Sequence, residues 1–397
     1  MSLRQLPDRL PLMRLAFRPF FYFAALFSLL AMLVWLGFWH GNVWLSPYGG
    51  MLWWHQHEML FGFAGAVIAG FLLTAVQNWT GRPGVSGWAL LGLVVLWLAA
   101  RVLLAYAAFL PGWLLLLVDV SFLPLVAIIM ARSVVAVRLW RNLLFLPVLL
   151  LLGTANAAMH LGVINGDALL NREASHLSVL TITLLMVVLG GRVIAFFTAR
   201  KLGFPQPDRS PLLEALSLGS MAVIIVLQLI SLLSDLGSDR LMAALMTIAA
   251  LSNAWRLAQW KGWLGWREPL LWGLHLSYAF IPFGLLLWAW QLVSGQRVET
   301  AVHALAIGAM ATMMLAMMAR VSLGHTGRAI QTLPGIGLAL GTLLVAGLLR
   351  SVWLVVFPQS SHWVFSAAII AWCISYWVFL LHYTVPLFSG RVDGKDG

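Results

Sequence analysis

The chain has 397 residues, of which 62% are hydrophobic and only 9% are charged. Soluble domains carry about 25% charged residues, so this composition excludes a water-soluble globule as well as a collagen-like or disordered chain. The net charge is +11, but the basic residues stand in short gaps between apolar runs, where Lys and Arg orient helices in a bilayer. We therefore expect the lipid bilayer as a partner, and no nucleic acid.

The apolar runs predict an all-α polytopic bundle of about twelve transmembrane helices. A spanning helix needs about 20 apolar residues, and the runs lack the period-two alternation of barrel strands. The gaps between them are too short for a soluble domain, so residues 1–397 are predicted to form one membrane domain. The predicted spans are 20–39, 52–77, 88–109, 113–137, 142–161, 176–197, 211–233, 241–258, 269–292, 300–319, 334–356 and 363–384.

The Lys and Arg residues predict the orientation of these spans, because cytoplasmic loops are enriched in them. With the N-terminus in the cytoplasm, 19 of the 24 fall on the inner side. Both termini are then cytoplasmic, and the first span is expected to be retained rather than cleaved as a signal peptide. The basic residues left on the outer side are Arg101, Arg172, Arg240, Arg297 and Arg350.

The single cysteine, Cys373, limits the cofactor chemistry. One cysteine excludes an intrachain disulfide, a CxxCH haem attachment and a cysteine-bound iron–sulfur cluster. A metal must then be held by His, Met, carboxylate or backbone groups, and a haem must be bound non-covalently. Ten histidines are present, and ionisable residues inside a membrane are usually functional.

The densest histidine group opens the second span, with His55, His57 and the carboxylate of Glu58. Imidazole is the commonest metal ligand, so both histidines are candidate ligands, and Glu58 is a candidate catalytic proton carrier. On a helix, residues two apart point about 200° away from each other. The two rings should then serve different sites, whereas an extended backbone would let them share one ion. The alternative is an interfacial pair within a tryptophan belt.

His303 opens the tenth span and is followed by a stripe of methionines on one helical face, Met310, Met314 and Met317. We interpret His303 as a metal ligand. The stripe could form a Cu(I) path, because thioethers select Cu(I), but we favour its interpretation as core packing.

The second, sixth and tenth spans share a layout, which predicts a weak internal repeat. Each carries histidine near its outer end (His55 and His57, His176, His303) and Gly-Arg near its inner end. Three arcs of four helices, each sending one of these spans inward, would gather the histidines in one outer-side pocket. The layout is similar to that of haem–copper oxidases and nitric oxide reductases in arrangement, not in sequence.

Histidines toward the inner side form a second set of candidates. His275 lies within the ninth span and could bind a second cofactor with His325 or His382, or it could be a hydrogen-bonded core residue. His325 precedes Thr326 and Arg328, a combination that suits an anion such as a haem propionate or a lipid phosphate.

Two further pairs of polar residues are placed together by the predicted spans. Arg101 and Asp119 fall at similar depth on neighbouring helices, which predicts a buried ion pair. Asn156 and His160 are four residues apart on one helix, so that their side chains could hydrogen-bond to each other.

Several long motifs in these regions resemble the NnrS family. The second-span motif is followed by Asn78-Trp79-Thr80-Gly81, and the sixth span departs from the family pattern at Ala195, where proline is expected. The matching segments are Phe17-Arg18-Pro19-Phe20-Phe21, Trp54-His55-Gln56-His57-Glu58-Met59-Leu60-Phe61-Gly62-Phe63, Gly190-Gly191-Arg192-Val193-Ile194, Leu274-His275, His303-Ala304-Leu305 and Met317-Met318-Ala319-Arg320-Val321-Ser322-Leu323-Gly324-His325-Thr326-Gly327-Arg328.

The resemblance implies a haem b- and copper-containing protein of the bacterial inner membrane, linked to nitric oxide and nitrosative stress. The leading hypothesis is that it binds nitric oxide and reduces or scavenges it, in the manner of a nitric oxide reductase, with electrons from quinol or an external donor. A copper transporter or delivery protein and a haem-based nitric oxide sensor are the alternatives. The expected metal ligands are His55, His57 and His303, then His275, His176 and His325, with Arg320 and Arg328 as cofactor-binding residues.

Overall fold

The computed structural model describes residues 10–106, 108–208, 210–234 and 237–395, and these residues form helices and loops without a strand. Twelve of the helical stretches are long and apolar enough to cross a membrane. This confirms the twelve predicted spans, including those around residues 142–161 and 241–258. Large apolar side chains such as Trp113 and Leu212 are exposed on the described chain, as expected where lipid rather than water covers the surface.

Within the described residues the chain divides into two compact units. The first unit comprises residues 10–178, 318–331 and 376–395, and the second comprises 179–317 and 332–375. Three helices, α9 (Ala168–Leu202), α14 (Thr312–His325) and α17 (Ser361–Phe388), contribute residues to both units.

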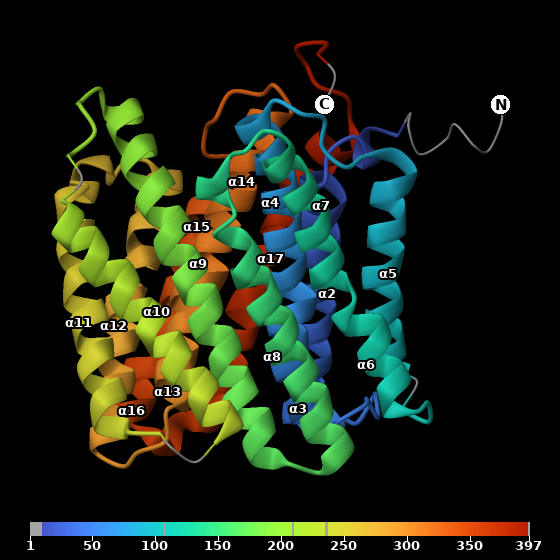
Figure 1. Cartoon of the computed structure of the whole chain (residues 1–397), viewed down its shortest axis with the longest axis vertical. Helices are drawn as coiled ribbons and strands as arrows, with labels where there is room; N and C mark the ends of the chain where they lie inside the picture. The colour runs from blue at the N-terminus through green and yellow to red at the C-terminus, as the bar shows by residue number, and fades with distance from the viewer. Residues whose placement is uncertain (1–9, 107, 209, 235–236, 396–397) are drawn as a thin grey trace. The chain divides into compact units, whose positions relative to one another are not determined.

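The first unit is built around its aromatic core. Phe17, Phe20 and Phe21 at the start of α2 are fully buried, as is Phe145 on α8. Helices α4, α7 and α8 pack side by side (Figure 1). Besides the shared helices it contains α2 (Phe17–Trp39), α3 (Gly50–His57), the π-helix η3 (Glu58–Ala64), α4 (Gly65–Thr80), α5 (Gly87–Tyr106), α6 (Gly112–Val120), α7 (Phe122–Ala136), α8 (Phe145–Asn165) and the short 3-10 helices η2 (Pro11–Met13) and η4 (Trp140–Asn142).

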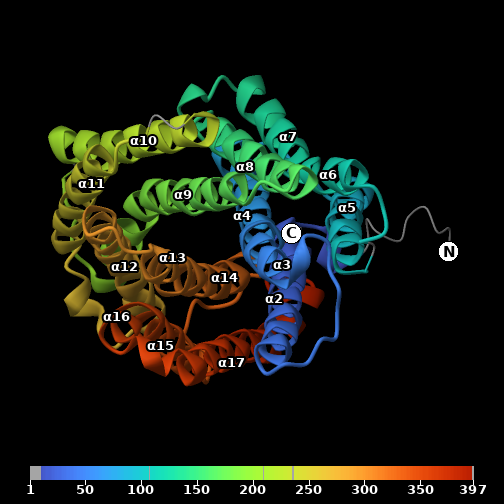
Figure 2. The ribbon, with the colours of Figure 1, turned by 90° about the horizontal axis from the view of Figure 1, so that it is seen from below.

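The second unit packs α10, α11 and α12 as neighbours (Figure 2). Of the methionines in the predicted stripe, Met310 and Met314 are buried, as expected for core packing. Its other helices are α10 (Pro211–Leu233), α11 (Asp239–Gln259), η5 (Gly262–Gly265), α12 (Pro269–Val293), α13 (Glu299–His303), the π-helix η6 (Ala304–Ala311), α15 (Ile336–Leu348), the π-helix η7 (Leu349–Trp353), α16 (Leu354–Val356) and η8 (Pro358–Ser360).

Two of the predicted histidine motifs run directly into π-helical backbone. The segment η3 begins at Glu58, immediately after His57, and η6 begins at Ala304, immediately after His303. Short π-helical segments inside α-helices occur frequently at functional sites.

The fourth span is interrupted next to its acidic residue. Helix α6 ends at Val120 and α7 begins at Phe122. Pro124 has no N–H to donate to the carbonyl of Val120, which removes one helical hydrogen bond at the break. Asp119 lies in the last turn of α6, directly before this break.

Candidate metal centre

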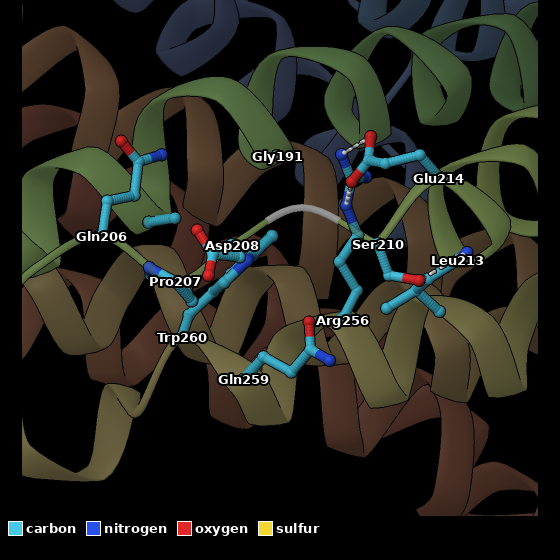
Figure 3. A pocket seen from close by; sticks show the side chains of 11 residues that line it. Gly191, Gln206, Pro207, Asp208, Ser210, Leu213, Glu214, Arg256, Gln259 and Trp260 are labelled. Carbon is cyan, nitrogen blue, oxygen red and sulfur yellow. Dashed lines mark hydrogen bonds and ion pairs between the residues drawn. The ribbon is translucent and has the colours of Figure 1, made fainter.

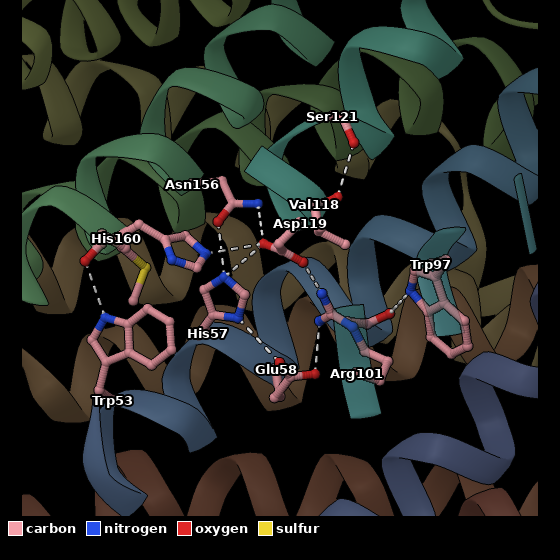
Figure 4. Close-up of polar contacts among 12 residues, drawn as sticks. Trp53, His57, Glu58, Trp97, Arg101, Val118, Asp119, Ser121, Asn156 and His160 are labelled. Atoms are coloured by element: carbon pink, nitrogen blue, oxygen red, sulfur yellow. Dashed lines mark hydrogen bonds and ion pairs between the residues drawn. The ribbon is translucent and has the colours of Figure 1, made fainter. Parts of the chain in front are cut away.

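A buried polar cluster lies inside the first unit, where α3, η3, α5, α6 and α8 meet (Figure 4). Its side chains are at most 4% exposed, and burying so many polar groups in an apolar bundle is costly unless they bind one another. The polar cluster consists of His57, Glu58, Arg101, Asp119, Asn156 and His160.

Arg101 holds the two acidic residues of the polar cluster together. One guanidinium nitrogen donates to Glu58 Oε2 at 2.7 Å, and the other forms an ion pair with Asp119 Oδ1. The predicted pair of Arg101 and Asp119 is therefore confirmed, and Glu58 extends it to a triad of charges. The planar fork of arginine suits two carboxylates at once.

Three potential ligand atoms converge beside this ion pair. Asp119 Oδ2 lies 3.1 Å from His57 Nε2 and 3.3 Å from His160 Nε2. The three atoms lie within 4.8 Å of one another, and all three residues are buried. Asn156 donates to the same Oδ2 at 2.6 Å and accepts at its Oδ1 from His57 Nε2 at 2.8 Å. Asn156 and His160 thus both bind Asp119.

These separations fit the coordination of one metal ion. Imidazole nitrogens and carboxylate oxygens bind first-row metals at about 2.0–2.2 Å, which places adjacent ligand atoms roughly 2.8–3.6 Å apart for angles between the octahedral and the tetrahedral value. The two contacts to Asp119 Oδ2 fall in this interval. His160 Nδ1 is buried and has no hydrogen-bond partner among the described residues, so His160 retains an unused donor or acceptor atom. The donor set of two imidazoles and one carboxylate suits copper or zinc.

The charges of the polar cluster balance. Both ring nitrogens of His57 face oxygen acceptors, because Nδ1 lies 3.2 Å from Glu58 Oε1 while Nε2 faces Asp119 and Asn156. The ring then donates from both nitrogens and is positive, so that it and Arg101 offset the two carboxylates. A monovalent cation bound at Nε2 in place of that proton would leave the total charge unchanged.

His55 faces a different neighbour from His57. Its ring stacks on Trp35 of α2, with centroids 4.3 Å apart, whereas the ring of His57 stacks on Trp53 at 4.5 Å. The helical geometry expected for residues two apart is therefore observed, and His55 does not join the group formed by Asp119 and His160.

A glycine makes room for the charges of the polar cluster. A Cβ atom at Gly62 would lie 2.5 Å from Glu58 Oε2 and 2.7 Å from Arg101 Nη1. The carbonyl of Gly62 accepts a hydrogen bond from Trp97 Nε1 at 3.0 Å. The Gly-Phe pair of the second-span motif thus leaves space for a buried ion pair.

His303 lies in the second unit and contacts an arginine. Its Nδ1 donates to the carbonyl of Glu299 at 2.6 Å, and its Nε2 accepts from Arg350 at 2.6 Å. The guanidinium of Arg350 also lies over the ring of Phe365, 3.7 Å from its centroid. The role of His303 as a ligand stays a prediction.

His275, also in the second unit, is 6% exposed and bonds to a threonine. Thr198 donates its hydroxyl hydrogen to the carbonyl of Ile194, so it accepts from His275 Nε2 at 2.8 Å. The other ring nitrogen, Nδ1, is buried without a hydrogen-bond partner among the described residues. Neither His325 nor His382 belongs to the same unit.

An ion-pair network in the second unit explains the two glycines of the sixth-span motif. Arg256 binds Glu214 through two contacts of 2.8 Å and donates to the hydroxyl of Tyr278 at 3.3 Å. A Cβ at Gly191 would coincide with the Arg256 guanidinium, and one at Gly190 would lie 2.8 Å from the Tyr278 ring. Both glycines therefore let α9 approach this network closely.

The same network forms one wall of a small, partly open pocket. Its lining contains no histidine, so it brings none of the predicted ligands together. Figure 3 shows the lining residues, which are Gly191, Ala195, Gln206, Pro207, Asp208, Ser210, Leu213, Glu214, Arg256, Gln259 and Trp260.

The remaining predicted residues lie outside the polar cluster. His176 and Arg320 are half-buried on α9 and α14. His325 ends α14, with its ring 5.6 Å from that of Phe17, and Arg328 donates to Ser389 Oγ at 3.0 Å. Their roles stay predictions.

Sequence reasoning nominated His57 as a ligand but not Asp119 and His160, which lie beside it. The signal was present in two separate observations. Asp119 was paired with Arg101, and His160 was paired with Asn156, but no pattern joined the fourth and fifth spans to the second.

Comparison with known families now decides the assignment. The model of the NnrS protein family matches residues 11–391 of the chain. The chain belongs to the NnrS family. No curated protein matches it. The NnrS motifs of the second, sixth and tenth spans contribute, respectively, His57 and Glu58 of the polar cluster, the two tightly packed glycines, and His303.

Proposed function

We propose that this NnrS-family chain is a haem b and copper protein of the bacterial inner membrane that binds nitric oxide and reduces or scavenges it. Family membership supports a role in the response to nitric oxide. The twelve spans support a multi-pass membrane protein. Nitric oxide is small and apolar, so it reaches a buried site through lipid without a charged pore.

The buried group of His57, Asp119 and His160 is the observation that carries the proposal. Copper would be held by the two Nε2 atoms and by Asp119 Oδ2. Bound there, it supplies a redox-active ion that binds nitric oxide. Haem iron would be bound by an imidazole outside this group, for which the sequence nominates His55, His176, His275, His303 and His325.

Glu58 is placed to move protons beside this group. Its Oε1 lies 3.2 Å from His57 Nδ1, while its Oε2 is held by Arg101 at 2.7 Å. Reduction of two molecules of nitric oxide to nitrous oxide and water consumes two electrons and two protons. Glu58 would relay the protons through Oε1, which accepts the Nδ1 proton of His57, and quinol or an external donor would supply the electrons.

The test is to record the reduced-minus-oxidised spectrum of the purified protein and to measure haem and copper in the same sample. We expect a b-type spectrum, with stoichiometric copper that is lost in His160→Ala. The control is His362→Ala, which changes an exposed histidine on α17. If His160→Ala retained its copper, the group of His57, Asp119 and His160 would not be the copper site.

The same sample distinguishes the alternatives. Copper without haem would favour a copper transporter or delivery protein. Haem that binds nitric oxide tightly without forming nitrous oxide would favour a sensor. Either result would overturn the proposal that the protein reduces nitric oxide.

A further inference from the structure

Arginines from distant parts of the chain converge where α17 ends in the first unit. Arg18 lies in the first turn of α2, Arg328 follows α14, and Arg391 follows α17. Arg14 lies just before α2, and its charge, like those of Arg328 and Arg391, repels that of Arg18. We call Arg14, Arg18, Arg328 and Arg391 the arginine group.

Arg18 is the buried centre of the arginine group and binds the end of α17. Its Nη1 donates to the carbonyls of Leu387 at 2.9 Å and Ser389 at 2.7 Å. Carbonyls at the end of a helix lack helical partners and carry the negative end of its dipole. This capping interaction accounts for Arg18, which is fully buried.

Arg328 is incompletely bound, whereas each guanidinium nitrogen of Arg391 has an acceptor. Arg328 donates through Nη2 to Ser389 Oγ at 3.0 Å, while its Nη1 is buried without a hydrogen-bond partner among the described residues. Arg391 donates to the carbonyl of His325 at 2.9 Å and forms an ion pair with Asp393 at 2.6 Å. Hydrogen bonds from Arg391 lower the pKa of Asp393 to about 2, so this carboxylate stays ionised at neutral pH.

Four arginines therefore lie together, and arginine cannot discharge by losing a proton in a protein. Asp393 pairs with Arg391, while Arg14 and Arg328 form no ion pair among the described residues. Excess positive charge at the edge of a bilayer attracts anionic lipid, and arginine binds phosphate oxygens strongly.

We propose that the arginine group binds the phosphate of an anionic phospholipid head group at the inner surface of the membrane. Three observations favour lipid as the source of the phosphate. The group joins the ends of the spanning helices α2, α14 and α17; Arg14, Arg328 and Arg391 are half-buried and so reach the surface; and Arg328 Nη1 still lacks an acceptor. This proposal is independent of the nitric oxide chemistry.

The test compares lipid retention by the full-length protein and its variants. Protein reconstituted with equal amounts of phosphatidylcholine and phosphatidylglycerol is repurified in neutral detergent, and the bound lipid is identified by native mass spectrometry. We expect phosphatidylglycerol to be retained in preference to phosphatidylcholine, and its retention to fall several-fold in Arg328→Gln and in Arg14→Gln. Arg14→Gln tests the charge while leaving the cap on α17 intact.

The matched control is Arg82→Gln, which removes an exposed arginine after α4 in the same unit. Equal retention of phosphatidylglycerol by Arg82→Gln and Arg328→Gln would overturn the proposal. If inorganic phosphate stabilises the protein and the lipid is not selectively retained, the site binds free phosphate. That result would overturn the proposal of a lipid head group. Loss of haem in Arg328→Gln with lipid retention unchanged would assign Arg328 to a cofactor carboxylate instead.

Discussion

The Nε2 atom of His303 lies 2.6 Å from a guanidinium nitrogen of Arg350. The other ring nitrogen donates to the carbonyl of Glu299, which fixes the tautomer and leaves the Nε2 lone pair for an electrophile. Histidine ligands of metals are commonly oriented in this way by a hydrogen bond at the second nitrogen. Arg350 occupies the direction in which a metal would bind, so the two exclude each other at this atom.

Arg350→Gln should therefore strengthen metal binding if His303 is a ligand. Removing a competing charge-assisted hydrogen bond, worth about 1.5 kcal/mol, corresponds to roughly tenfold in affinity. Spectroscopic titration of the apoprotein with haem would measure this change, with the exposed Arg297→Gln in the same unit as the control. An unchanged affinity in Arg350→Gln would exclude His303 as a haem ligand.

Asp119→Asn should abolish copper binding and destabilise the first unit. The substitution removes a ligand atom and leaves Arg101 with one carboxylate instead of two. Breaking a buried ion pair costs about 3–5 kcal/mol. Thermal unfolding in detergent, together with a copper assay, would measure both effects. Asp239→Asn, at an exposed helix start, should change neither, and full copper occupancy in Asp119→Asn would contradict the proposed ligand set.

Gly62→Ala should be destabilising because the new methyl group would meet the buried ion pair. The nearest atoms, on Glu58 and Arg101, lie 2.5 and 2.7 Å from the position of the added Cβ, and overpacking of this kind costs about 1–3 kcal/mol. The control is Gly92→Ala on α5, where a Cβ meets no atom within 4 Å. Thermal unfolding should show a loss of stability in the first variant alone, and equal stability would contradict the packing argument.

Glu58→Gln should slow the turnover of nitric oxide while leaving the haem content intact. The amide keeps the shape of the side chain and its contact with Arg101, but it cannot accept and release a proton. Loss of a positioned proton carrier typically costs 10²–10⁴-fold in rate. Nitrous oxide production with a chemical reductant, normalised to haem, would measure the change. Unchanged turnover would exclude Glu58 from proton transfer.

Arg256→Lys should destabilise the second unit despite the conserved charge. A lysine cannot keep two contacts to Glu214 together with those to Tyr278 and the carbonyl of Val187. We expect a loss of about 2–3 kcal/mol, from the hydrogen bonds to charged groups that are broken. Thermal unfolding of Arg256→Lys and of the exposed Arg240→Lys would test this, because only Arg256→Lys should have a lower unfolding temperature.

The spans and the ion pair were predictable because each depends on one-dimensional information. A helix that crosses a bilayer needs a fixed length of apolar sequence, which located all twelve spans. The depth of a residue in the bilayer follows from its position along the span. Arg101 and Asp119 were predicted to pair because their positions place them at similar depths. The opposite directions of His55 and His57 followed from helical geometry alone.

The composition of the candidate metal site was not predictable in the same way. His160 lies beside His57 and shares Asp119 with it, an arrangement that depends on how the second, fourth and fifth spans pack. The sequence allowed Asn156 and His160 to bond to each other as neighbours on one helix. Both instead bind Asp119, because a carboxylate is a stronger acceptor than a neutral side chain in a site of low polarity. The π-helical segments leave no mark in the hydrophobic spacing.

The π-helix of Glu58–Ala64 sets the rotational phase between the two halves of the second span. A π-helical turn holds about one residue more than an α-helical turn, and one residue corresponds to about 100° of rotation. Deleting a single residue from this segment would restore α-helical bonding and turn His57 away from Asp119, while α4 could keep its packing against α7. One additional residue of backbone thus couples the ligand-bearing half of the span to the half that anchors it in the bundle.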